Sequence, residues 1–150
     1  MNQEKIMKRR MIRAIILFLI TLVALIVFIT LYVDETKRVQ ETYRRQYRTD
    51  LAKVSEDIES YKNGEGDHEL RYMRIVSDMS AANSFAFLIN DFEDKSIIIN
   101  ELTTCIMKYP EQMKTKLDDM DKALNDILDD LDKGYDEAKA VVDSVDKKGS

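Results

Sequence analysis

Residues 14–33 form an unbroken apolar run, AIILFLITLVALIVFITLYV, which contains no charged residue, no Gly and no Pro. Fifteen of its twenty side chains are Ile, Leu, Val or Phe. A helix of this length rises about 30 Å, which matches the hydrocarbon core of a bilayer. A core helix of a water-soluble domain carries a polar stripe, and this run has none on any face. The run therefore predicts a transmembrane helix.

Basic residues precede the apolar run and acidic residues follow it. The stub of residues 1–13 is basic, whereas Asp34 and Glu35 stand directly after the run. By the positive-inside rule, the stub is cytoplasmic and residues 34–150 form an extracytoplasmic domain. The bare Lys/Arg count is nearly a tie, because residues 37–48 carry five Lys/Arg, so the expected orientation depends on the charges nearest the run. The residues expected to flank the membrane are Arg9, Arg10, Arg13 and Tyr32.

A cleaved secretory signal peptide is the alternative explanation of the run. Such a peptide has an apolar region of about 7–15 residues that ends at a pair of small residues. The run here is longer, and it ends in FITLYVDE, where no such pair occurs. An uncleaved signal anchor in a cell membrane is therefore the favoured prediction.

The remaining sequence shows helical periodicity. Residues 34–62 continue as a polar helix with one apolar seam, and Asn63 to Asp67 contain the turn that ends it. A second long helix is expected over 68–92, with Asp67 as its N-cap. Residues 97–109 have the composition of a strand but helical spacing, and no second strand-like segment could pair with them, so a helix is predicted. Its start is assigned to a cap at Ser96.

The last helix is expected to run from Pro110 to about residue 146. Its apolar seam continues through an eleven-residue repeat, LDDMDK at 117–122 and LDDLDK at 128–133. Eleven residues are close to three helical turns, so the apolar face keeps its direction. Gly134 is expected to weaken the helix or bend it. The predicted fold is all-α: one transmembrane helix followed by an antiparallel bundle of three long helices, or four if the chain breaks fully near Pro110 or residues 93–96.

Catalytic and metal-binding motifs are lacking in this sequence. It has one Cys and one His, so neither a disulfide within the chain nor a zinc site with the usual ligand spacing can form. Cys105 is expected to be buried, and His68 to be a solvated residue at a helix start. No nucleophile elbow, phosphate loop or dinucleotide fingerprint is present. We therefore predict no enzyme activity and no cofactor.

Acidic residues are concentrated in the last predicted helix. A face of this kind is most often simply solvated; it could instead dock a basic partner, or hold Ca²⁺ weakly through pairs such as Asp126 and Asp130. No twelve-residue calcium-loop pattern is present. The candidate docking residues are Asp118, Asp119, Asp126, Asp129, Asp130 and Asp136.

These features predict a non-enzymatic, single-pass membrane protein whose helical faces serve interaction or assembly in the cell envelope. Its expected partners are membrane lipid at residues 14–33 and either a second copy or another membrane or envelope protein. The whole chain has a net charge of −5 and the body that follows the apolar run is acidic, which argues against nucleic acid as a partner. The alternative is a ligand-sensing or regulatory ectodomain, which would have to signal through a membrane partner because the stub is so short.

Overall fold

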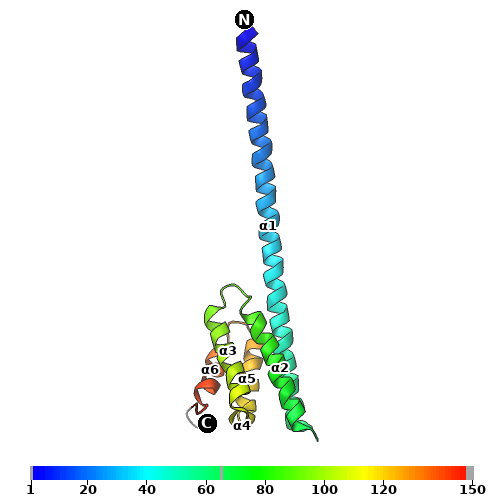
Figure 1. Cartoon of the computed structure of the whole chain (residues 1–150), viewed down its shortest axis with the longest axis vertical. Coiled ribbons are helices and arrows are strands. Elements are labelled where there is room, and N and C mark those ends of the chain that lie inside the picture. Colours follow the sequence, from blue (N-terminus) through cyan, green and yellow to red (C-terminus); the bar gives the residue numbers. More distant parts are fainter. Residues whose placement is uncertain (1, 65, 148–150) are drawn as a thin grey trace. The chain divides into compact units, whose positions relative to one another are not determined.

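The computed structural model describes residues 2–64 and 66–147, and in these residues all regular secondary structure is helical (Figure 1). The predicted all-α class is confirmed. The helices are α1 (Asn2–Asn63), α2 (His68–Ala86), α3 (Glu93–Lys108), α4 (Pro110–Lys114), α5 (Leu117–Asp129) and α6 (Tyr135–Asp143).

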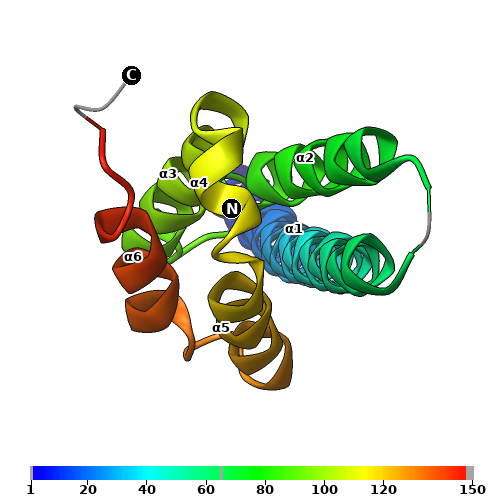
Figure 2. The same cartoon turned by 90° about the horizontal axis from the view of Figure 1, so that it is seen from below.

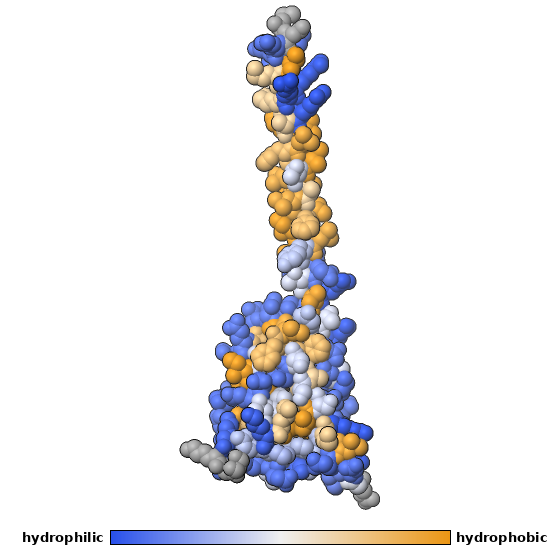
Figure 3. All heavy atoms as spheres, viewed as in Figure 1, coloured by the Kyte–Doolittle hydropathy of each residue, from blue (hydrophilic) through white to orange (hydrophobic). Residues whose placement is uncertain are grey.

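The chain divides into two compact units between Val39 and Gln40, within the continuous helix α1. In the first unit the apolar run forms a band of exposed apolar side chains around the helix (Figure 3). By length and composition this part of α1 could cross a membrane, and none of its apolar window is buried. Thr21 and Thr30 donate their hydroxyl hydrogens to the carbonyls of Leu17 and Ile26, each over 2.9 Å. The two threonine hydroxyl groups of the band are thereby satisfied within the helix itself.

The second unit, from Gln40 onward, has one hydrophobic core. The seam predicted on α1 is buried there: Tyr47, Leu51, Val54 and Ile58 are each 0% exposed. Helix α3 packs against α2 and α6, and α5 packs against α6 (Figure 2). Apolar residues three or four positions apart on each helix supply the rest of the core, among them Met79, Ile99, Leu102, Leu124 and Val142. The helical prediction for residues 97–109 is correct.

Aromatic side chains join three of these helices. The ring of Phe92 packs nearly perpendicular to the rings of Tyr47 and Tyr135, at centroid distances of 5.6 and 5.9 Å. The hydroxyls of the two tyrosines lie 3.3 Å apart. Tyr43, one turn before Tyr47, packs beside Phe85. Tyr47 is fully buried in the core, and Tyr43 is partly buried and packs against it.

The helix boundaries agree with the sequence in part. Asp67 caps α2 as predicted, since its carboxylate accepts a hydrogen bond from Leu70 N at 3.0 Å. Pro110 opens α4, as expected for a residue without an N–H. Helix α2, however, ends at Ala86 rather than near residue 92. Ser96 caps nothing: it lies inside α3, where its hydroxyl donates to the Glu93 carbonyl at 2.8 Å.

The single helix expected from Pro110 to residue 146 is also wrong, because the chain forms α4, α5 and α6 instead. Gly134 explains the break between α5 and α6. Its φ of +80° is left-handed, and a Cβ there would lie 2.5 Å from the Ala123 carbonyl oxygen and 2.8 Å from Cγ1 of Ile127. The close approach lets the chain fold back so that α6 packs on α5. The eleven-residue repeat therefore does not continue one helix.

Candidate functional site: an acidic depression beside α5 and α6

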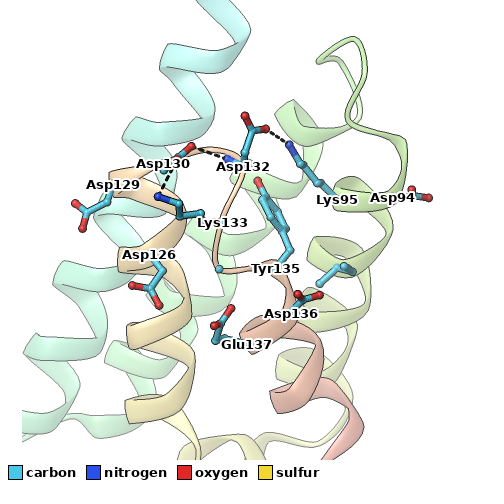
Figure 4. A pocket seen from close by; sticks show the side chains of 12 residues that line it. Asp94, Lys95, Asp126, Asp129, Asp130, Asp132, Lys133, Tyr135, Asp136 and Glu137 are labelled. Carbon is cyan, nitrogen blue, oxygen red and sulfur yellow. Dashed lines mark hydrogen bonds and ion pairs between the residues drawn. The ribbon is translucent and has the colours of Figure 1, made fainter.

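A broad depression of about 870 Å³ opens between the start of α3, the end of α5 and the start of α6 (Figure 4). We call it the acidic depression, because seven carboxylates and two lysines line it, a formal excess of five negative charges. The lining residues are Asp94, Lys95, Ile98, Asp126, Asp129, Asp130, Asp132, Lys133, Gly134, Tyr135, Asp136 and Glu137.

The break after α5 creates this cluster. Asp130 leaves the helix in an extended conformation and Gly134 turns the chain into α6, so the acidic end of α5 and the acidic first turn of α6 face one opening. In a single continuous helix these residues would be spread along its length at about 1.5 Å per residue. The concentration of charge is therefore a consequence of the turn.

Both lysines of the depression are already paired. The Lys95 ammonium forms an ion pair with Asp132 and also lies 4.7 Å from the ring centre of Phe92 and 5.5 Å from that of Tyr135. Lys133 lies 3.2 Å from a carboxylate oxygen of Asp130 (Figure 4). Neither lysine pairs with the remaining carboxylates of the depression, so much of the negative charge faces solvent.

The carboxylate of Asp130 is fixed in its charged form. It accepts a hydrogen bond from the backbone N–H of Asp132 at 3.0 Å. This hydrogen bond, followed by the one from Lys133, lowers the pKa of Asp130 below its ordinary value. In Figure 4 no hydrogen bond or ion pair is drawn to the carboxylates of Asp94, Asp126, Asp129, Asp136 and Glu137. These five carboxylates offer the open acceptor groups of the site.

The structure brings together four of the six residues predicted for an acidic docking face, namely Asp126, Asp129, Asp130 and Asp136. It separates the other two. Asp118 forms an ion pair with Lys62 of α1, and Asp119 is exposed in the first turn of α5, outside the depression. Sequence reasoning missed the contribution of Asp94 and Lys95, because their approach depends on how α3 packs against α6.

The residues predicted to flank the membrane, Arg9, Arg10, Arg13 and Tyr32, are all exposed on α1. The three arginines precede the apolar run in the sequence, and Tyr32 stands near its other end. Their side chains are therefore available to the interface of a bilayer, where Arg and Tyr are commonly found.

Groups that could support catalysis or metal binding are dispersed. Among residues 2–64 and 66–147, no three His, Cys, Asp or Glu side chains converge to hold a metal ion. Cys105 is buried as predicted, and its burial raises the pKa of the thiol. His68 is exposed and touches the Tyr61 ring at a centroid distance of 5.3 Å.

No protein-family model matches this chain, and no curated protein and no solved structure shows significant similarity to it. The class that the structure defines is an all-helical protein with one apolar helix long enough to span a membrane and a separate helical bundle. The assignment of function must therefore follow from the surface chemistry of these two units.

Proposed function

We propose that this protein is a non-enzymatic, single-pass membrane protein whose bundle docks another protein at the membrane surface. Residues 14–33 would cross the bilayer, with residues 1–13 in the cytoplasm and the bundle on the other side of the cell membrane. The observation that carries the proposal is the apolar run of α1, in which every large apolar side chain is exposed. Leaving so much apolar surface in water is strongly unfavourable, which supports a lipid environment for this part of α1.

The proposed topology is supported by the charges nearest the run, three arginines before it and two carboxylates after it. Fractionation of cells that express the full chain tests the anchor. The protein should sediment with membranes, remain there after an alkaline carbonate wash and dissolve in detergent. A reporter fused after Ser150 that is active only outside the cytoplasm should be active. Full-length protein in the soluble fraction would refute the proposal.

The proposed docking surface is the acidic depression, and its proposed partner is a protein with a basic surface. Support comes from the five excess negative charges and from the pairing of both local lysines. Two such depressions would repel each other, so a different protein fits this surface better than a second copy. Association that depends on charge should weaken as salt rises, because ions screen exposed charges within about 8–10 Å at 0.1–0.15 M.

A photocrosslinker at Asp129 in native membranes tests this surface. A specific adduct should form at low salt and diminish at high salt. Neutralising Asp126 and Asp136 to Asn should remove it, whereas a control that neutralises exposed Glu56 and Glu59 of α1 to Gln should not. An adduct of equal yield in both double variants would refute docking through the depression. The alternative of a ligand-sensing domain remains a prediction, and a thermal-shift response to small molecules would favour it.

A further inference from the structure

The ammonium group of Lys95 lies at the wall of the acidic depression, in a place that suits a cation (Figure 4). It stands over two aromatic rings, 4.7 Å from the ring centre of Phe92 and 5.5 Å from that of Tyr135, and it forms an ion pair with Asp132. Ring faces and carboxylates are the groups that proteins use to bind ammonium and guanidinium ions. We call this place the cation site, and in this structure the chain's own lysine fills it.

The core holds the two rings of the cation site in place. Phe92 is 2% exposed and Tyr135 is 6% exposed, and their rings pack nearly perpendicular to each other at a centroid distance of 5.9 Å. The hydroxyl of Tyr135 also lies 3.3 Å from that of Tyr47 on α1. None of these contacts involves Lys95, so the rings are preorganised for a cation whichever chain supplies it.

Lys95 is held by the cation site rather than by its own helix. It stands in the first turn of α3, where the helix dipole disfavours a positive charge. Its partner Asp132 belongs to the turn between α5 and α6, and the Asp132 side chain remains 81% exposed while the pair is formed. A cation that arrives from solvent can therefore reach the same carboxylate and compete with Lys95 for it.

We propose that Lys95 is an internal competitor of the partner: when the basic partner docks, one of its lysine or arginine side chains displaces Lys95 from the rings of Phe92 and Tyr135. The inference rests on the proposed function, because it needs a basic protein at the acidic depression. A site that is vacant for only a fraction of the time binds more weakly by that fraction. Lys95 therefore lowers the affinity of the depression and favours a partner whose cation is well placed.

The second lysine of the depression provides a matched control. Lys133 carries the same charge, but its side chain is 73% exposed, against 24% for Lys95, and it pairs with Asp130 three positions earlier in the chain. Lys95→Ala and Lys133→Ala therefore remove the same charge from the same depression, and only Lys95→Ala also vacates the cation site. Lys95→Arg keeps a cation that can stack on the rings.

The full chain in a nonionic detergent is titrated with the peptide tetralysine at low and constant salt, and calorimetry gives the dissociation constant. Both alanine variants should bind tetralysine more tightly than the wild type does, because the depression becomes more negative. Lys95→Ala should gain about two- to fivefold more than Lys133→Ala, since its ring faces are free to contact a lysine of the peptide. Lys95→Arg should bind as the wild type does.

Proton NMR of the wild-type chain gives a second measurement, which depends on no substitution in the bound protein. The side-chain methylene protons next to the Lys95 ammonium lie over two rings, so their resonances should be shifted upfield, and the spectrum of Lys95→Arg identifies them. At saturating tetralysine these resonances should move toward the values of an ordinary lysine. If circular dichroism shows that Lys95→Ala does not fold, this measurement decides alone.

A gain in Lys95→Ala no larger than that in Lys133→Ala, or Lys95 resonances that stay in place at saturation, would overturn the exchange and leave docking at the depression intact. Absence of tetralysine binding to the wild type and to both alanine variants would overturn the exchange and the docking surface together.

Discussion

The two units of this protein use the same apolar residue types in opposite ways. In residues 14–33, fifteen of twenty side chains are Ile, Leu, Val or Phe, no charged residue comes between them, and all fifteen are exposed. In residues 40–63 of the same helix, apolar residues recur every three or four positions, and the seam is fully buried from Tyr47 to Ile58. Composition alone does not separate these outcomes. The spacing of the apolar residues decides whether the helix is covered by protein on one face or needs an apolar solvent on all faces.

The largest effect is expected from charging the apolar run. Substituting Val23→Arg and Ile26→Arg places two cations near the middle of the predicted span, which costs about 5–7 kcal/mol on an insertion scale. The variant should lose membrane association and appear in the soluble or aggregated fraction. The control is Glu41→Arg with Glu59→Arg, at exposed positions of the same helix. If the Val23/Ile26 variant still sedimented with membranes after a carbonate wash, the proposed difference between the lipid-exposed and the core-forming parts of α1 would be wrong.

Truncation of one leucine in each unit sharpens the comparison. Leu51 is 0% exposed in the core, so Leu51→Ala should lower the free energy of unfolding of the bundle by about 2–5 kcal/mol. Leu25 is exposed in the apolar run, and Leu25→Ala should leave bundle stability unchanged. Denaturant titration of the full chain in detergent, followed by near-ultraviolet circular dichroism, measures both. Equal losses in the two variants would mean that the run packs against the bundle.

Alanine substitutions at Gly134 and Gly66 distinguish the cost of overpacking from that of backbone strain, because both glycines have a positive φ and only Gly134 is closely packed. In Gly134→Ala, backbone strain of about 1–2 kcal/mol adds to overpacking of about 1–3 kcal/mol, because the new Cβ would meet the Ala123 carbonyl and Ile127. In Gly66→Ala the φ of +100° is also strained, but nothing lies within 4 Å of the new Cβ. The same titration should therefore show a clearly larger loss for Gly134→Ala. Equal losses would argue against tight packing of the turn on α5.

Much of the fold is predictable from the sequence, because helical spacing and end signals are local. The uninterrupted run, the seam at Tyr47 and Leu51, the Asp67 cap and the helical start at Pro110 all depend on neighbours within a few residues. The break at Gly134 was foreseen only as a bend, since its size depends on the close approach of Ala123 and Ile127. That approach is a tertiary contact.

The candidate site was less predictable for the same reason. Acidic residues near one another in sequence identified Asp126, Asp129, Asp130 and Asp136. Nothing local could place Asp94 and Lys95 of α3 beside them, or move Asp118 away to pair with Lys62. Phe87 and Leu88 were expected inside a second helix that extends to residue 92. Their exposure follows from the early end of that helix.

The smallest effect is a pH dependence confined to the bundle. Asp57 of α1 shares a hydrogen bond with Asp78 of α2, and desolvation by burial, followed by this neighbour, raises the pKa of Asp57 from 3.8 to about 6; Arg74 partly opposes the shift. The folded state therefore binds this proton more tightly than the unfolded state, and the contribution of Asp57 to stability falls as pH rises from about 4 to about 6. Asp57→Asn mimics the protonated group and should be more stable than the wild type at pH 7, with an advantage that shrinks to zero below pH 4.

Asp130→Asn should behave oppositely and lose stability at pH 7, because the pKa of Asp130 is lowered in the folded state. Denaturant midpoints between pH 4 and pH 7 test the pair, and a constant difference between Asp57→Asn and the wild type would show that the two carboxylates do not share a proton. Residues 14–33 contain no Asp, Glu or His, so membrane association should stay constant between pH 4 and pH 7 while the stability of the bundle changes. Membrane association and bundle stability therefore report on the two units separately.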